Sequence, residues 1–303
     1  MKKFLKWAAI VLGSLIVIVV ITAFLLANHL DNMRKQKFVV GDSRIPIPSD
    51  SASVARGSYW AHATCGNCHG SDFSGSDFFN DPKLGYIHAL NLTPGKGGIG
   101  ATYSDEDWIR AIRHGVRKGG GGIMIMPTEN FTNWGDDDLA CIVAFLKTLP
   151  PVDQEWAPPH FTFMTRVIAG AGGFGVLYPA SIIDHTKLNG KTAPAEGATT
   201  EYGTYLVKVI GCRSCHGEQL NGAQPGDPNS PFSPNISPGG KLGNWTNAQF
   251  IQTLRTGVDP DGRTLNPKFM PWLGISKLDD EMLSAIFLYL KSQPAVPDAP
   301  HKK

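Results

Sequence analysis

The sequence has 303 residues, a length that suggests about two domains. Hydrophobic residues make up 42% of the chain and charged residues 18%, which excludes a globally disordered protein and allows a folded core. The formal net charge is +2, so the chain lacks the strong basic excess of a nucleic-acid-binding protein. Five cysteines are too few for a disulfide scaffold of this size.

The first predicted element is a membrane anchor over residues 1–28. Three lysines precede an uncharged apolar run from Trp7 to Ala27. As a helix, a run of this length rises about 30 Å, which matches the hydrocarbon core of a bilayer. A cleaved signal peptide has a shorter apolar core, about 7–15 residues, before a small-residue cleavage site. We therefore expect an uncleaved anchor, followed by a linker over residues 29–50.

Beyond that linker, the chain repeats itself. Five segments recur in the same order: Cys65–His69 with Cys212–His216, Asn91–Pro94 with Asn235–Pro238, Arg113–Val116 with Arg255–Val258, Met126–Pro127 with Met270–Pro271, and Leu146–Lys147 with Leu290–Lys291. The repeat is of domain size and too long for a solenoid. It predicts two homologous domains over residues 51–155 and 199–303, joined by an interdomain linker over residues 156–198.

Each repeat predicts helices at matching places. One helix precedes each cysteine pair (residues 55–63 and 202–210), one follows Ser104 or Thr246, and one ends the repeat (136–149 and 279–292). Ser104 with Asp107, and Thr246 with Gln249, have the spacing of capping boxes. The predicted fold class is all-α, with two small helical domains in tandem behind the transmembrane helix. Because glycine- and proline-rich loops separate the helices, a large apolar cofactor would have to supply part of each core.

The interdomain linker contains an unusual apolar stretch. Residues 161–178 hold several glycines and a single charge, Arg166. We expect this stretch to pack across the interface between the two domains. The alternative is a surface patch that contacts a partner or a membrane.

The cysteines form two C-x-x-C-H motifs, which are typical of c-type haem attachment. Two thiols on one helical turn form thioethers with the porphyrin, and the adjacent histidine binds the iron. A structural zinc site would need four ligands in each domain, and a redox-active cysteine pair would leave the histidine unexplained. We therefore predict two covalently bound haem c groups, attached through Cys65, Cys68, Cys212 and Cys215, with His69 and His216 as iron ligands.

The fifth cysteine stands apart from these motifs. Cys141 lies in the predicted last helix of the first repeat and has no cysteine at the matching place in the second. It is expected to be a buried apolar side chain, with a reactive thiol as the alternative.

The second axial ligand of each iron is predicted to be a methionine. Met126 and Met270 each precede a proline at matching places in the repeats. Methionine and histidine together raise the haem potential and close the iron to substrates. The competitor in the first domain is Met124. Three histidines without counterparts could each be a distal ligand, but they are expected to lie on the surface or in loops: His62, His88 and His114.

Two further matched pairs have weaker chemical meaning. Arg113 and Arg255 precede a Gly-Val segment, and a guanidinium is a natural partner for a haem propionate. The alternative for both is a solvated arginine at a helix end. Asn91 and Asn235 could also bind a propionate, but a role in shaping the turn before Thr/Ser-Pro is favoured.

These motifs resemble the multi-haem cytochrome c subunits of membrane-bound bacterial dehydrogenases for alcohols, gluconate and related substrates. The resemblance covers about residues 50–298 and rests on the repeated segments given above. It implies two class I cytochrome c domains, with Cys65, Cys68, His69 and Met126 serving one haem and Cys212, Cys215, His216 and Met270 the other. Subunits of that family usually carry three haem domains and a C-terminal anchor, whereas here two haem motifs follow an N-terminal anchor.

The predicted function is that of a membrane-anchored dihaem electron carrier without catalytic residues. Because cytochrome c attachment occurs on exported proteins, the haem domains are expected to face the periplasm or outer surface of a bacterial inner membrane. The expected partners are redox proteins: a dehydrogenase, a quinol-oxidising complex, a soluble cytochrome or a terminal oxidase. Membrane lipid is expected to contact the anchor, and no nucleic acid is expected.

The sequence leaves two alternative functions. A dihaem peroxidase or a haem-based sulfur oxidoreductase needs an open iron position, which the paired Met-Pro segments disfavour. An assembly module would use the anchor and the apolar linker to tether a larger respiratory complex.

Overall fold

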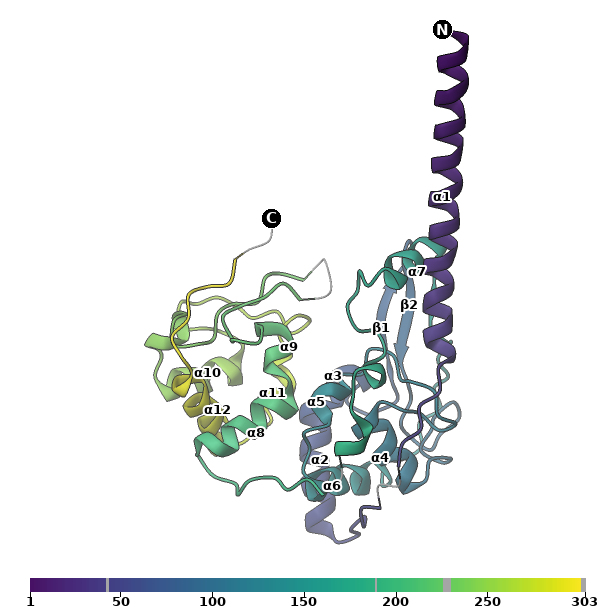
Figure 1. The fold of residues 1–303 in the computed structure, drawn as a ribbon. Helices are drawn as coiled ribbons and strands as arrows, with labels where there is room; N and C mark the ends of the chain where they lie inside the picture. The colour runs from purple at the N-terminus through teal and green to yellow at the C-terminus, as the bar shows by residue number, and fades with distance from the viewer. Residues whose placement is uncertain (42–43, 189, 226–229, 301–303) are drawn as a thin grey trace.

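The computed structural model describes residues 1–303 except 42–43, 189, 226–229 and 301–303 (Figure 1). Its first element, α1, spans Lys2–Lys35 and projects far from the rest of the chain. Most of its apolar side chains are exposed, and it is the one helix in the described residues that is long and apolar enough to cross a membrane. The expectation of one apolar N-terminal helix is confirmed.

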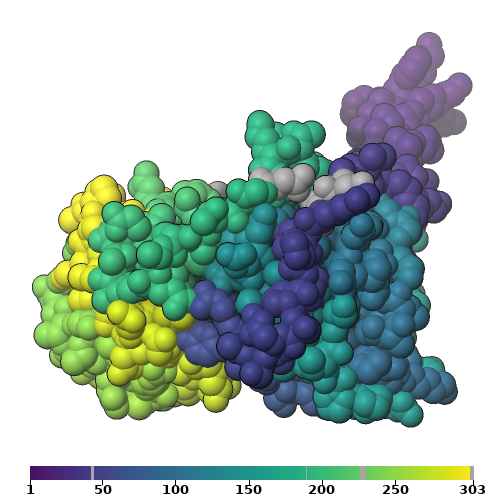
Figure 2. All heavy atoms as spheres, turned by 90° about the horizontal axis from the view of Figure 1, so that it is seen from below, coloured from purple at the N-terminus to yellow at the C-terminus, as the bar shows by residue number. Residues whose placement is uncertain are grey.

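The helix continues beyond the apolar run into the expected linker. Residues up to Lys35 are helical, because Ala27 and Leu30 are buried against the folded part of the chain. After α1, the chain runs across one face of the first repeat (Figure 2). Tertiary packing therefore sets the end of this helix.

The first repeat forms five helices. Asp50 caps the first of them by accepting a hydrogen bond from the N–H of Ser53 (2.9 Å), and Ser104 and Asp107 form the expected capping box. Gly115 ends the middle helix in the left-handed region, with φ of +64°. The helices are α2 (Ser51–Thr64), α3 (Gly66–His69), α4 (Asp105–His114), α5 (Thr128–Phe131) and α6 (Asp136–Leu146).

The second repeat forms the same sequence of helices. Thr246 and Gln249 form the second expected capping box, and Gly257 ends that helix with φ of +70°. The α-helices are α8 (Thr200–Ile210), α9 (Cys212–His216), α10 (Asn247–Thr256), α11 (Trp272–Ile275) and α12 (Asp280–Ser292). The second repeat also contains a short 3-10 helix, η3 (Lys241–Asn244). Two more, η1 (Pro179–Ser181) and η2 (His185–Lys187), lie in the interdomain segment.

In each repeat, the first and last helices cross at a glycine. A Cβ added to Gly57 of α2 would collide with the carbonyl oxygen of Cys141 in α6. A Cβ added to Gly203 of α8 would collide with the carbonyl oxygen of Ala285 in α12. The two backbones therefore approach so closely that no other residue fits without moving a helix. One continuous buried core includes residues of both repeats.

The all-α prediction is incomplete, because the first repeat also carries a sheet. Strands β1 (Ser76–Asp81), β2 (Gly85–Ala89) and β3 (His160–Phe161) pair antiparallel in that order. Within the register, Phe79 faces Ile87 and Tyr86 faces His160. The strands are short, and the third comes from the interdomain linker. Aromatic packing between Tyr86, His88, Trp156 and His160 covers the sheet.

The prediction that the apolar interdomain stretch packs across the interface between the domains is wrong. The stretch forms α7 (Phe163–Gly170), which lies against α1 (Figure 1). Gly170 lies against the backbone carbonyl of Leu26, and the rings of Phe24 and Phe163 are 5.2 Å apart. A second, smaller core joins the two helices, formed by Leu30, Ala169, Leu177 and Tyr178. The exposed apolar surface of α1 explains this choice of partner.

The glycine crossings give a first prediction. Gly57→Ala and Gly203→Ala should each destabilise the chain by about 1–3 kcal/mol or more, since each forces two packed helices apart. The free energy of unfolding in denaturant measures the effect. Gly13→Ala, in the exposed part of α1 with no atom near the added Cβ, is the matched control. Unchanged stability in both crossing variants would contradict the packing described here.

Candidate functional site

The two motif histidines are held in the same way. The Nδ1 atom of His69 lies 2.8 Å from the carbonyl oxygen of Leu90, and Nδ1 of His216 lies 2.8 Å from that of Pro234. A carbonyl oxygen can only accept, so Nδ1 carries the proton and Nε2 is left as the atom that can bind a metal. Burial lowers the pKa of both histidines, which favours the neutral ring. This is the arrangement that orients a ligating imidazole.

An asparagine turn places each of these carbonyl groups. Asn91 accepts a hydrogen bond from the N–H of Thr93 (2.9 Å) and donates to the carbonyl of Val152 (2.8 Å). Asn235 accepts from the N–H of Ser237 (2.9 Å) and donates to the carbonyl of Val296 (2.9 Å). The turn function expected for both asparagines is confirmed. Each turn also ties the end of its repeat to the segment that orients the histidine.

The four motif thiols lie one turn apart in two pairs. Burial raises the pKa of Cys65 to about 11 and that of Cys212 to about 12, and it also raises the pKa of Cys68 and Cys215. A redox-active cysteine pair depends on a lowered pKa, so the surroundings of these thiols disfavour that chemistry. Cys141 is buried in α6, as expected of an apolar side chain.

The two methionines lie just before equivalent short helices. Met126 and Met270 are partly buried against the main core, and the proline after each is the N-cap of α5 or α11. Met124 packs instead with the smaller core beside α1 and α7. The surroundings of Met126, and not those of Met124, therefore match those of Met270.

The two arginines bind the start of the last helix in each repeat. Arg113 is fully buried, pairs with Asp136 (2.6 Å) and donates to the carbonyl of Trp134 (2.8 Å). Arg255 pairs with Asp280 (2.7 Å) and donates to the carbonyl of Ser276. Arg113 is thus not a solvated arginine at a helix end. Its Nε has no hydrogen-bond partner among the described residues, so it retains a donor for a carboxylate such as a propionate.

The unmatched histidines have other partners. Nδ1 of His62 bonds the carbonyl of Ser58 within α2 (2.8 Å), and His88 lies near Asp77. The prediction that His114 lies on the surface or in a loop is wrong. His114 is buried, and its Nδ1 lies 3.0 Å from Nδ1 of His185 in η2. The end of α4 is therefore tied to the interdomain segment.

The two repeats meet through pairs of equivalent contacts. In each pair, the same element of each repeat contacts the other repeat. Tyr59 of α2 accepts a hydrogen bond from the N–H of Asp279 at the start of α12 (2.7 Å). Tyr205 of α8 accepts one from the N–H of Gly135 at the start of α6 (3.2 Å). Such reciprocity is the mark of an interface with twofold symmetry, here within one chain.

Each tyrosine hydroxyl also donates into the helix that it caps. Tyr59 donates to Sδ of Met282 (3.1 Å), and Tyr205 donates to Asp138 (2.5 Å). Met282 and Asp138 are the third residues of α12 and α6. Each hydroxyl therefore holds the first turn of the other repeat's last helix from two sides.

A second reciprocal contact involves the cysteine motifs themselves. Asn130 of α5 donates from Nδ2 to Oγ of Ser214, which lies between Cys212 and Cys215 (3.1 Å). Gly274 of α11 lies against the side chain of Asn67, the equivalent residue of the first motif. The short helix after each Met-Pro pair therefore contacts the C-x-x-C-H motif of the other repeat.

Sequence reasoning had missed these interface residues. The 147-residue spacing of the cysteine motifs also aligns Asn67 with Ser214, and Tyr59 and Tyr205 are 146 residues apart, one residue fewer. The tyrosine pair was therefore a detectable signal. The glycine pair at the helix crossings, Gly57 and Gly203, has the same separation of 146 residues as the tyrosine pair.

Comparisons with known proteins identify the family of the chain. The cytochrome c family matches residues 54–150. A protein named diheme cytochrome c-type from Cereibacter sphaeroides is 30% identical over 287 residues, which cover 83% of this chain and 92% of that protein. The chain therefore belongs to the family of c-type cytochromes that includes this protein. Membership indicates a role in electron transfer.

Other relatives are named as parts of dehydrogenases. The fructose dehydrogenase cytochrome subunit of Gluconobacter japonicus is 28% identical over 276 residues, covering 82% of this chain and 54% of that subunit. The cytochrome c subunit of the quinone-dependent alcohol dehydrogenase of Komagataeibacter europaeus is 28% identical over 279 residues, covering 82% and 58%. The chain thus spans little more than half the length of these two relatives.

The contact of buried His114 with His185 gives a prediction of pH dependence. Burial, followed by the charges of His185, Arg113 and Arg110, lowers the pKa of His114 to about 4, against about 6.5 in an unfolded chain. Between these values the unfolded chain binds more protons, so stability should fall as the pH falls through this window. At pH 5 the loss is about 2 kcal/mol relative to pH 7.5.

Denaturant unfolding at both pH values measures this loss. The His114→Gln variant has no imidazole to protonate at this position, so its stability should change less between pH 7.5 and pH 5. An identical change in the variant and the parent chain would exclude His114 as the source.

Proposed function

We propose that the chain is a membrane-anchored dihaem cytochrome c that transfers electrons between redox partners. The domains are proposed to be cytochrome c domains over residues 51–155 and 199–303. The observation that carries the proposal is the pair of C-x-x-C-H motifs, each with a histidine held by a carbonyl so that Nε2 can bind iron. Two haem c groups fit these residues better than zinc, since the described residues hold no group of three or more His, Cys, Asp or Glu side chains placed to bind a metal ion.

The residues proposed to hold the haems are equivalent in the two repeats. Cys65 and Cys68 would attach one haem, and Cys212 and Cys215 the other. The proposed axial ligands are His69 with Met126, and His216 with Met270. When bound, each haem supplies an iron that cycles between the ferrous and ferric states.

The protein's own groups favour electron exchange over substrate chemistry. The hydrogen bonds of His69 and His216 to carbonyl groups fix the ring orientation and the tautomer. The methionines, anchored at the starts of α5 and α11, are proposed to close the other axial side. Arg113, with its buried Nε donor, and Arg255 are the proposed propionate partners.

The reciprocal interface supports electron exchange between the two sites within one chain. The helix that follows Met126 contacts the second cysteine motif at Ser214, and the helix that follows Met270 contacts the first motif at Asn67. The ligand-bearing segments of the two repeats are thus in direct contact, and no diffusing carrier is needed between them.

The proposed location is a bacterial cytoplasmic membrane, with α1 as the span and both haem domains in the periplasm. The length and composition of α1 support the span, and haem c attachment supports an exported domain. The names of the relatives support a dehydrogenase as the donor. The proposed acceptor is a respiratory-chain protein.

The haem count tests the proposal. The purified chain should contain two haems, measured by intact mass and by the pyridine haemochrome spectrum. The double variant Cys65→Ser with Cys68→Ser should contain one, and so should Cys212→Ser with Cys215→Ser. One haem in the parent chain would refute the dihaem assignment.

The methionine ligands have a separate test. Met126→Ala should lose part of the weak near-infrared charge-transfer absorption of methionine-ligated ferric haem, and its reduction potential should fall. Met124→Ala is the matched control, since its side chain packs beside α1 and α7. Loss of the absorption in Met124→Ala, but not in Met126→Ala, would reverse the assignment.

A further inference from the structure

A second apolar surface lies beside the C-terminal end of the apolar run of α1. Helix α7 contacts α1 at Phe24 and Leu26, which lie in the last turn of the run that ends at Ala27. If α1 crosses a bilayer as proposed, this level is the boundary between hydrocarbon and headgroups. Helix α7 is therefore held at that boundary by its packing against α1.

The outward face of α7 is apolar. Phe163, Met164 and Ile168 are 43%, 62% and 38% exposed, and Val176 in the following loop is 50% exposed. The charge on α7, Arg166, is paired with Asp31 of α1. Exposed apolar residues that gather on one element, with the charge neutralised, mark a surface that contacts something apolar.

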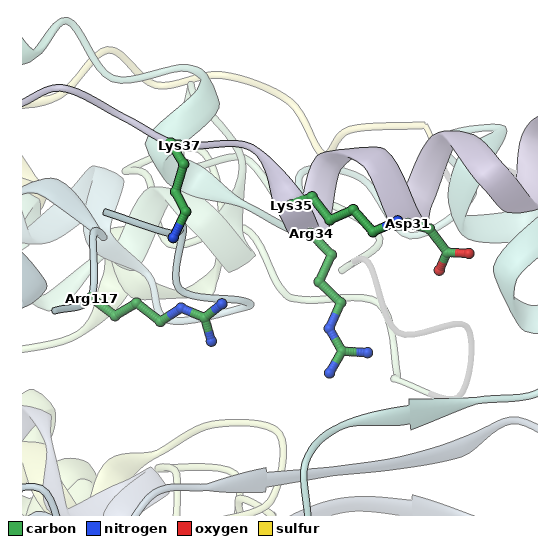
Figure 3. A pocket seen from close by; sticks show the side chains of 5 residues that line it. All are labelled: Asp31, Arg34, Lys35, Lys37 and Arg117. Atoms are coloured by element: carbon green, nitrogen blue, oxygen red, sulfur yellow. The ribbon is translucent and has the colours of Figure 1, made fainter. Parts of the chain in front are cut away.

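A basic cluster lies next to this surface, farther from the span. Arg34, Lys35, Lys37 and Arg117 surround a hollow of about 500 Å³, with Asp31 at its edge (Figure 3). Arg34 lies about two helical turns beyond Ala27, a rise of about 11 Å, which a long side chain can bridge to the headgroup layer. Among the described residues, Arg34, Lys35 and Arg117 form no ion pair.

We propose that α7 and the basic cluster form a second contact with the membrane, in addition to the span. Helix α7 lies in the interface with Phe163, Met164 and Ile168 in the acyl region, while the basic cluster contacts the phosphates of anionic lipids. The proposal rests on the proposed anchoring by α1. A helix and a span joined rigidly would fix the orientation of the haem domains relative to the membrane.

Lipid is the occupant that the observations favour. The apolar face of α7 is continuous with exposed apolar side chains of α1, among them Phe24 and Leu25. The cations lie on the side where headgroups would be, and not on the side of the acyl chains. This order, apolar then basic along the direction of α1, matches the order of layers in a bilayer.

The test uses nitroxide labels on the full-length holoprotein in lipid nanodiscs of phosphatidylcholine and phosphatidylglycerol. Single cysteines are introduced in a Cys141→Ser background as Met164→Cys and Ile168→Cys. Collision rates are measured with oxygen, which concentrates among acyl chains, and with a water-soluble nickel complex. Two controls give the reference values: Leu15→Cys reports on the span, and Leu288→Cys reports on the exposed face of α12.

The proposal predicts that labels at 164 and 168 collide several-fold more with oxygen than with nickel, as at 15, and that the order reverses at 288. Nickel access at 164 with oxygen access at 15 would overturn the second contact and leave the anchor intact. Nickel access at 15 would refute the anchor itself. Protection of 164 from both reagents would indicate a protein partner and overturn the lipid assignment.

The contact of the basic cluster with anionic headgroups is tested separately. In nanodiscs of phosphatidylcholine alone, nickel collisions at 164 should rise several-fold. The double variant Arg34→Gln with Arg117→Gln should show the same rise in the mixed lipid. Equal values in both lipids and in the variant would exclude a headgroup contact of these cations.

Discussion

Two tyrosine hydroxyls, one from each repeat, hold the first turn of the other repeat's last helix. Each accepts a backbone N–H and donates into that turn, so neither repeat completes its last helix with its own residues alone. The last helix in turn packs on the first at Gly57 or Gly203, and the first helix leads directly into the cysteine motif. The geometry of each proposed haem site therefore depends on contacts made by the other repeat.

This arrangement explains why two copies of a small unit occur in one chain. A symmetric interface normally joins two subunits, and its strength then depends on their concentration. Covalent linkage removes that dependence and allows the two halves to differ. Asp138, for example, forms an ion pair with Arg56 and a hydrogen bond with Tyr205, whereas the equivalent position in α12 is Met282. One half thus uses a buried charge where the other uses an apolar side chain.

Much of the site could be predicted from local sequence. The capping boxes at Ser104 and Thr246, the asparagine turns and the apolar N-terminal helix each depend on residues close together in the chain. The sheet was missed because its strands are short and the third, His160–Phe161, comes from a distant segment. The packing of α7 on α1 was missed because an apolar segment does not reveal which apolar partner it will choose. The burial of His114 depends likewise on the distant residue His185.

The proposed role as an electron carrier rests on direct exchange between the two halves. The most direct test reduces a fraction of the fully oxidised chains with a short pulse and follows how the electron redistributes between the two haems, at wavelengths where their spectra differ. The interface predicts a first-order redistribution whose rate constant is independent of protein concentration, because the ligand-bearing segments of the two repeats are in contact. A rate that rises in proportion to protein concentration would show that electrons pass between molecules, and it would contradict the proposed exchange within one chain.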